Sequence, residues 1–159
     1  MLPCYPLFYT EYMRLSIKVI GRVENSIEKR GRIETANITS RIVVDPLYGN
    51  ALDGIEPFSH IVIIYWLDQI QAKERKVLKV HPRGDLSIPL TGVFATRSPM
   101  RPNPIALTTV KLLKRKGNIL TVKGLDAING TPVMDIKPYL PEPFHPAEVK
   151  LPGWFNKKH

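Results

Sequence analysis

The 159-residue sequence contains one cysteine, Cys4, and no long hydrophobic run. A single cysteine excludes an internal disulfide and a thiolate metal cage within one chain, which favours a reducing, cytoplasmic setting. The longest apolar run, residues 61–67, is far shorter than the roughly 20 residues that a membrane helix needs. The first residues also lack the basic start and the unbroken apolar core of a secretory signal, so we interpret residues 1–14 as an N-terminal arm. We expect no membrane association.

Acidic residues are scarce relative to basic ones. Lys and Arg number 23 against 14 Asp and Glu, which gives a net charge of +9. An excess of this size attracts polyanions, so nucleic acid is the leading partner. The four histidines have no spacing typical of metal ligands, and we expect no metal. No G-x-G-x-x-G follows a predicted strand, which excludes the common dinucleotide cradle.

The sequence does contain many short segments with strand character. Apolar and polar residues alternate at Leu15, Ile17 and Val19 and again over residues 38–44, while residues 61–67 are apolar on both faces, as in a central strand. The other predicted strands are residues 77–81, 90–96, 105–113, 119–124 and 133–137, with a hairpin turn at residues 116–118. A helical turn is suggested only at residues 53–58.

Seven or eight short strands predict a mostly β fold, either a barrel or a tightly curled sheet, and we expect a single domain without a boundary inside residues 15–140. Prolines recur after Pro138 and favour an extended strap over regular structure. Residues 144–159 form the predicted C-terminal tail.

Residues 92–105, Gly-Val-Phe-Ala-Thr-Arg-Ser-Pro-Met-Arg-Pro-Asn-Pro-Ile, leave a strand and enter a loop with three prolines and two arginines. Proline restricts its own φ and the residue before it, so Ser98, Arg101 and Asn103 are held in extended geometry. A rigid loop that presents guanidinium, hydroxyl and amide groups suits an anionic or polar ligand, because little ordering remains to be done on binding. The alternative is a proline-stiffened turn with solvated arginines.

This loop also carries a resemblance to a known family. Phe94-Ala-Thr-Arg-Ser-Pro99, followed by Arg101-Pro-Asn-Pro-Ile105, resembles the signature of the TsaA-like, or TrmO-type, tRNA methyltransferases. The segments that match in the same order are Phe58-Ser-His-Ile61, Gly124-Leu-Asp126 and Asn129-Gly-Thr-Pro-Val-Met-Asp-Ile-Lys-Pro-Tyr139. The resemblance covers roughly residues 15–143 and implies that they form a small single-domain β-barrel, TsaA-like, that binds S-adenosylmethionine, usually as a homodimer. It also implies methylation of the exocyclic amine of a threonylcarbamoyl-modified adenosine beside the tRNA anticodon.

The resemblance implies a set of cofactor contacts. Arg97 is the expected donor to the cofactor's carboxylate, because its planar fork matches that group. The implied cofactor-binding residues are Asp68, Gln69, Arg97, Leu107, Asp126 and Asn129. An Asx-turn cap remains an alternative for Asp126, and ordinary core packing remains one for Leu107.

The segment Asp135-Ile-Lys-Pro-Tyr139 resembles the polar-Pro-aromatic arrangements by which amino methyltransferases hold an adenine. An acceptor beside the amine orients its lone pair toward the methyl group, and an aromatic face stacks the base. Asp135 and Tyr139 are therefore the catalytic candidates. The alternative is that Tyr139 packs as an ordinary side chain and that Asp135 pairs with Lys137 or an arginine.

Basic and amide side chains near these motifs are candidates for contact with tRNA. The substrate-binding candidates are Lys29, Arg30, Arg32, Arg101, Asn103 and Lys137. Clusters within residues 73–83 and 111–116 either touch phosphate or form a solvated edge that keeps strands from pairing with other molecules.

The chain departs from the family pattern at two places. Residues 29–33 stand where the family has Pro-Arg-Gln, and Asp68-Gln69 stands where it has His-Gln. The competing function is a noncatalytic barrel that binds nucleic acid or a nucleotide, with Arg97 and Arg101 as phosphate anchors.

Overall fold

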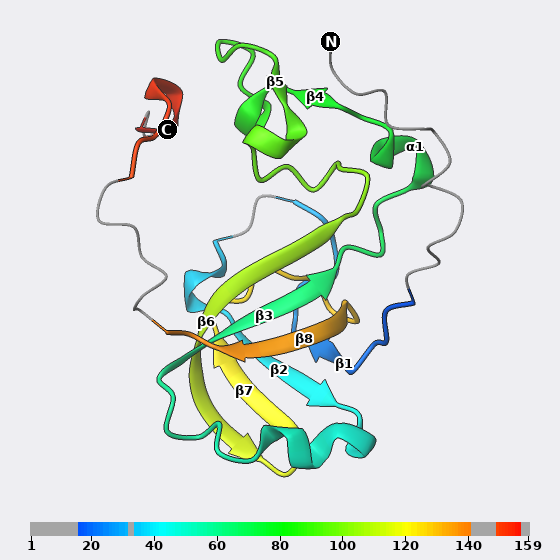
Figure 1. Cartoon of the computed structure of the whole chain (residues 1–159), viewed down its shortest axis with the longest axis vertical. Coiled ribbons are helices and arrows are strands. Elements are labelled where there is room, and N and C mark those ends of the chain that lie inside the picture. Colours follow the sequence, from blue (N-terminus) through cyan, green and yellow to red (C-terminus); the bar gives the residue numbers. More distant parts are fainter. Residues whose placement is uncertain (1–15, 32–33, 141–148, 157–159) are drawn as a thin grey trace, which may run out of the picture.

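Strands with alternating buried and exposed residues close into an antiparallel barrel in the computed structural model, which describes residues 16–31, 34–140 and 149–156 (Figure 1). The barrel strands are β1 (Gly21–Glu24), β2 (Thr39–Val44), β3 (His60–Trp66), β6 (Ile105–Lys116), β7 (Ile119–Lys123) and β8 (Pro132–Pro138). Their order around the barrel is β1-β2-β7-β6-β3-β8, and pairing of β1 with β8 closes it. The predicted mostly β barrel is confirmed.

The barrel interior is filled by the inward residues of all six strands, among them Ile42, Ile61, Ile63, Leu120 and Val133. Each fully buried aliphatic side chain of this size stabilises the fold by about 1.5–3 kcal/mol. β1 packs so closely on β2 that a Cβ atom at Gly21 would lie 2.5 Å from the carbonyl oxygen of Val43. Glycine at this position therefore permits β1 to pair with β2.

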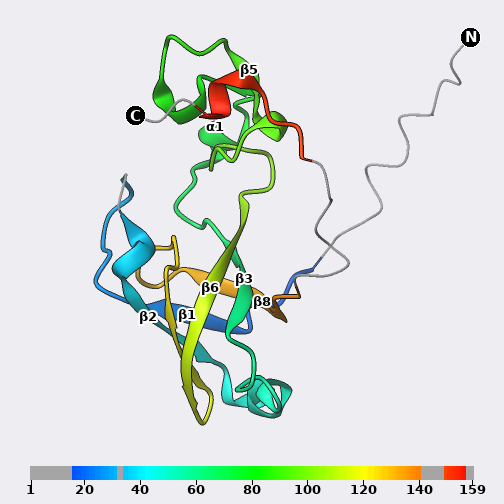
Figure 2. The same cartoon turned by 90° about the vertical axis from the view of Figure 1, so that its left-hand side faces the viewer.

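Residues 67–104 leave the barrel between β3 and β6 and form a lobe above one of its ends (Figures 1 and 2). The lobe contains α1 (Ala72–Arg75), β4 (Lys79–Val80) and β5 (Thr91–Gly92), with 3-10 turns at Pro82–Gly84 and Val93–Ala95. β4 and β5 pair with each other and form a separate two-stranded sheet. Of the described helices, none is long and apolar enough to cross a membrane.

The 3-10 turn η6 (Gly153–Asn156) contacts this lobe. Arg83 Nη2 donates to the carbonyl oxygen of Phe155 at 3.0 Å, and its guanidinium carbon lies 5.6 Å from the centre of the Phe155 ring. Arg83 has a φ of 59°, in the left-handed region that non-glycine residues rarely adopt. The turn that follows the predicted strap, which spans Pro138 to Pro152, thus contacts the lobe, while residues 141–148 of the strap lie outside the described part of the chain.

The strand predicted at Leu15, Ile17 and Val19 is wrong for the residues that the structure describes. Residues 16–20 form no strand, and Ile17 and Val19 are 47% and 46% exposed. The reason is that β2 ends at Val44, opposite Gly21, so the ladder does not extend to the preceding residues. Residues 1–15, which include the predicted arm, lie outside the described part of the chain.

Three further predictions differ in extent or position. The strands expected at residues 77–81 and 90–96 shrink to β4 and β5, which pair only with each other, and Leu78 and Leu90 beside them stay exposed. The helical turn expected at residues 53–58 lies instead in the 3-10 segment η3 (Pro46–Leu52), where the Asp45 side chain accepts from the Leu47 amide. Helix α1 was not predicted, since four residues are too few to show a helical period.

Candidate functional site

A pocket of about 920 Å³ opens where the barrel meets the lobe. Its walls come from the loop before β2 (residues 27–31), the ends of β3 and β6, two segments of the lobe (residues 67–70 and 96–101) and the loop after β7 (residues 126–128). A volume of this size is typical of pockets that hold a small-molecule ligand or cofactor.

The inner part of the pocket is largely apolar. The aliphatic residues that line it are Ile27, Leu67, Ile70, Ala106, Ala127 and Ile128. Tyr65 joins them and is 2% exposed. Its hydroxyl donates to the carbonyl oxygen of Asp126 at 2.5 Å and lies 3.0 Å from Thr108 Oγ1. Burial raises the pKa of Tyr65 above its ordinary value, so the side chain stays a neutral donor.

Besides Lys29, three charged side chains line the pocket without a partner among the described residues. Asp68, Arg97 and Asp126 are exposed to solvent, and none of their charged groups has a hydrogen bond or ion pair with a described residue. The Asp126 carboxylate therefore caps no turn among the described residues, unlike the Asx-turn alternative. Two free carboxylates and one free guanidinium are available to a ligand that carries both a cationic and an anionic group.

Arg101 is used within the loop that presents Arg97. Its Nε donates to the carbonyl oxygen of Ser98 at 3.0 Å, and its Nη2 donates to those of Val93 at 3.1 Å and Thr96 at 2.9 Å. These contacts hold the motif loop in one shape, as the prolines predicted. Asn103 is exposed and does not line the pocket.

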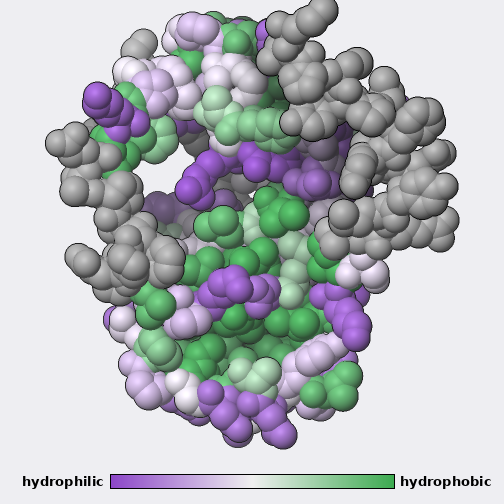
Figure 3. Space-filling view, in the orientation of Figure 1, coloured by the Kyte–Doolittle hydropathy of each residue, from purple (hydrophilic) through white to green (hydrophobic). Residues whose placement is uncertain are grey.

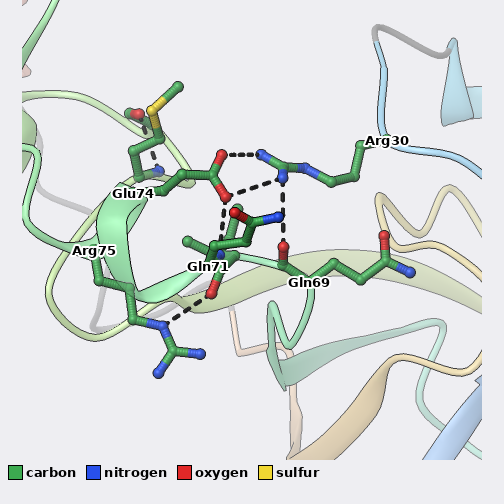
Figure 4. A network of polar contacts seen from close by, with 8 residues as sticks. Arg30, Gln69, Gln71, Glu74 and Arg75 are labelled. Carbon is green, nitrogen blue, oxygen red and sulfur yellow. Dashed lines mark hydrogen bonds and ion pairs between the residues drawn. The ribbon is translucent and has the colours of Figure 1, made fainter.

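A bidentate ion pair joins the loop before β2 to the lobe (Figure 4). Arg30 Nη2 lies 2.9 Å from Glu74 Oε1, and Arg30 Nη1 donates to Glu74 Oε2 at 3.2 Å and to the carbonyl oxygen of Gln69 at 3.4 Å. Glu74 also accepts from the Gln71 amide at 2.8 Å, within the capping box of α1. The hydrogen bonds from Arg30, and then the one from Gln71, lower the pKa of Glu74. Lys29, Arg30 and Gln69 line the pocket beside this bridge.

Two of the cofactor candidates, Leu107 and Asn129, differ in their position relative to the pocket. Leu107 lines the pocket and is 52% exposed, so the alternative of ordinary core packing is wrong. Asn129 lies outside the pocket and fastens its loop instead, because its Oδ1 accepts from the Asn25 amide at 3.3 Å and its Nδ2 donates to Glu28 at 3.4 Å.

The catalytic candidates lie outside the pocket of the single chain. Asp135 Oδ2 is 2.8 Å from Lys137 Nζ on β8, which is the pairing that the alternative expected. Tyr139 contacts His60 edge to face, with ring centres 6.4 Å apart. The structure therefore brings Asp68, Gln69, Arg97, Leu107 and Asp126 together and leaves Asp135, Lys137 and Tyr139 on another part of the barrel surface. Arg32 is outside the described residues.

Sequence reasoning missed Tyr65 and Thr108. The available signal was a tyrosine inside an aliphatic run, because a buried tyrosine hydroxyl usually needs a hydrogen-bond partner.

Comparisons with known proteins agree with this fold. The family model of the tRNA-methyltransferase O N-terminal domain matches residues 24–143. A probable S-adenosyl-L-methionine-binding protein of Methanothermobacter thermautotrophicus is 45% identical over 133 residues, which cover 80% of this chain and 91% of the relative. The human tRNA (adenine(37)-N6)-methyltransferase is 43% identical over 115 residues, which cover 72% of this chain and 25% of the human protein.

A crystal structure of TrmO from Pseudomonas aeruginosa superposes with a TM-score of 0.72 at 27% identity. The matched region covers 91% of this chain and 63% of that one.

Proposed function

The chain belongs to the tRNA-methyltransferase O family, and we propose that it uses S-adenosylmethionine to methylate the exocyclic amine of an adenosine in tRNA. One observation carries the proposal: a single pocket combines a free guanidinium, two free carboxylates and an apolar interior. Relatives named as S-adenosylmethionine-binding proteins support the choice of cofactor.

The residues of the pocket fit this cofactor group by group. The Arg97 guanidinium matches the carboxylate of the methionine part, and Asp68 and Asp126 match its ammonium and the ribose hydroxyls. Gln69 adds an amide at the same wall. The aliphatic interior suits the adenine ring, and Leu107 would contact it from the rim.

When bound, S-adenosylmethionine supplies an electrophilic methyl group, and the tasks left to the protein are orientation and exclusion of water. An acceptor beside the exocyclic amine would orient the nitrogen lone pair, and an aromatic ring would hold the base. We propose Asp135 and Tyr139 for these tasks. Because neither lines the pocket of its own chain, they would have to act on the pocket of a second chain.

The outer face of β3, β6 and β8 is suited to such a homodimer. Trp66 pairs with Ile105 and Ile64 pairs with Leu107 on this face, where hydrophobic residues gather (Figure 3). Ile64 also pairs with Asp135, so Asp135 lies two strands, or roughly 9.5 Å, from the pocket-lining Leu107. An exposed apolar face marks an interaction site, and pairing of two such faces would bring Asp135 of each chain toward the pocket of its partner.

The substrate is proposed to be the threonylcarbamoyl-modified adenosine beside the anticodon. The net charge of +9 favours tRNA, and Lys29 and Arg30 lie at the pocket where the bound nucleotide would enter. Arg32, Arg101, Asn103 and Lys137 remain further candidates for RNA contacts. An enzyme with this substrate would act in the cytoplasm.

A methylation assay tests the proposal. The full chain is incubated with S-adenosylmethionine and with tRNA that either contains or lacks the threonylcarbamoyl group, and the nucleosides are identified by mass spectrometry. We expect a methyl group on the modified adenosine. Binding of cofactor or tRNA without any methylation would instead support the noncatalytic barrel.

A further inference from the structure

The outer side of β2, β7 and β6 carries a cluster of basic residues that the pocket does not use. It consists of Arg41, Lys111, Lys114, Lys116 and Lys123, which we call the basic face. None of these three strands contains an acidic residue. The register places Lys111 directly opposite Lys123, and Lys114 and Arg41 on either side of Thr121. Cations from three neighbouring strands thus share one surface.

This arrangement works against the stability of the barrel. Like charges directly opposite each other on adjacent strands are destabilising. Arg41 pairs with Glu24 at 3.0 Å, but none of the four lysines has an ion pair with a described residue. The fold alone therefore does not account for the lysine pair Lys111 and Lys123.

Protection of a sheet edge does not account for the pair of Lys111 and Lys123 either. Charged residues often guard unpaired edge strands against association with other chains. Here β6 pairs with both β3 and β7, and β7 pairs with both β6 and β2. Figure 2 shows this side of the barrel, with β6 and the yellow β7 running together to their shared turn. Lys111 is paired with His60 and Lys123, and Lys123 is paired with Thr39 and Lys111, so this lysine pair lies at no free edge that it would need to protect.

The basic face also has a shape that admits a ligand chain. A shallow hollow of about 540 Å³ lies on it, and the charged and hydroxyl residues that line it are Arg41, Lys114, Lys116, Thr39, Thr121 and one carboxylate, Glu24, which is paired with Arg41. Lysine heads beside threonine hydroxyls are typical phosphate contacts. The centres of protein–protein interfaces, by contrast, are depleted of charged residues, so a protein partner fits this surface less well than a polyanion.

We propose that the basic face binds the phosphodiester backbone of the tRNA substrate. This inference rests on the proposed function and adds a second contact region to it. Lys114 lies seven residues along β6 from Leu107 at the pocket, a separation of about 20 Å. One tRNA is long enough to reach both regions, so the base enters the pocket while a distant part of its backbone lies on the basic face.

The test is the triple variant Lys111→Glu, Lys114→Glu, Lys123→Glu in the full chain. We expect its tRNA affinity to fall about ten-fold or more, and the slope of log affinity against log salt to fall by about 2–3, because three phosphate contacts are lost. Calorimetry should show unchanged S-adenosylmethionine affinity, since none of these residues lines the pocket. The same three positions changed to Gln should give a smaller loss in the same direction, which guards against a folding defect.

A matched variant controls for net charge. Lys18→Glu, Lys76→Glu, Lys150→Glu makes the same change in charge at exposed positions that are scattered along the chain, so it removes no cluster of basic residues. Equal losses of tRNA affinity in both triple variants would overturn the proposal, because the effect would then be one of total charge. If the variant with Lys111, Lys114 and Lys123 changed to Glu bound tRNA as tightly as the wild type, the proposal would also be overturned. The basic face would then be available to a different anionic partner. If the unaltered chain methylates tRNA in either case, the proposed function stands without this inference.

Discussion

The barrel and the lobe are built on different physical principles. In the barrel, fourteen buried residues form one hydrophobic cluster, and each strand is hydrogen-bonded on both sides. In the lobe, the two strands have two residues each, and Leu78, Leu86 and Leu90 are exposed. The lobe buries only a few aliphatic residues, Ile70, Ile88 and Val93, and polar contacts such as those of Arg101 and the Arg30–Glu74 pair also hold it.

The difference explains where the candidate site lies. An apolar core gives a stable frame but offers few polar groups, while the lobe presents free polar groups such as Arg97 and Asp68. The pocket forms at the boundary between the two regions, where the rigid barrel supports the polar side chains of the lobe. Substitutions in the barrel should therefore change stability most, and substitutions in the lobe should change binding most.

The largest effect is expected from Ile63→Ala on β3. Ile63 is fully buried, so the lost contacts and the resulting cavity should lower the free energy of unfolding by about 2–5 kcal/mol. Leu86→Ala in the lobe removes the same kind of side chain where it is 81% exposed, and should change stability by no more than about 0.5 kcal/mol. Urea denaturation of both variants measures the contrast. Equal destabilisation would contradict the exposed position of Leu86 in the lobe.

Arg97→Ala should give the next largest effect, and on binding instead of stability. Loss of a bidentate charged contact should weaken S-adenosylmethionine binding by about 2 kcal/mol, or roughly thirty-fold in Kd. The unfolding midpoint should stay the same, because Arg97 has no hydrogen bond or ion pair with a described residue. Arg97→Lys is the matched control and should recover part of the affinity, since it keeps the charge but not the fork. Unchanged calorimetric affinity in the alanine variant would remove Arg97 from the site.

The same contrast shows what could be predicted from the sequence. The sequence predicts β3 from its short run of apolar residues, and β6, β7 and β8 from short segments bounded by turn residues. These predictions hold because partner strands on both sides bury the inward positions. The strand expected at Ile17 failed because alternation does not reveal where the partner strand ends. In the lobe the pattern overestimated β4 and β5 and missed α1, since little burial constrains those residues.

The candidate site could be predicted in part for a related reason. Family motifs pointed to Asp68, Arg97 and Asp126, which the structure brings to one pocket. The sequence could not show that Tyr65, in the buried face of β3, ends at the pocket, because that depends on how the barrel closes. Nor could it show that Asp135 lies on a different part of the surface from the pocket.

Tyr65→Phe tests the boundary between the two regions and should have an intermediate effect. The variant keeps the ring but leaves the Asp126 carbonyl and the Thr108 hydroxyl without their hydrogen bonds to Tyr65, which should cost about 1 kcal/mol of stability. Cofactor affinity should fall a few-fold, because the Asp126 loop is less well held. Tyr48→Phe is the control, as the Tyr48 hydroxyl has no hydrogen bond with a described residue. If thermal denaturation and calorimetry gave the same values for both variants, the Tyr65 hydroxyl would have no part in holding the loop.

The smallest effect is expected from Glu74→Gln in the lobe, and it should depend on pH. Hydrogen bonds from Arg30 and from the Gln71 amide lower the pKa of Glu74 below its ordinary value of 4.5. A carboxyl group whose pKa is lowered in the folded state stabilises that state fully at pH values above its ordinary pKa. This contribution is lost as the pH falls through the lowered pKa.

At pH 7 the Glu74→Gln variant should therefore show less hydrogen-exchange protection at the Gln71 amide, which donates to Glu74, while the amides of β3 are unaffected. At a pH below the lowered pKa of Glu74 the protection factors of wild type and variant should converge, because the wild-type carboxyl group is then protonated as well. Glu34→Gln, at an exposed position without an ion pair to a described residue, should show no such difference at either pH. A difference at Gln71 that stayed the same at both pH values would mean that the shape of the side chain, and not its charge, holds the lobe to the loop before β2.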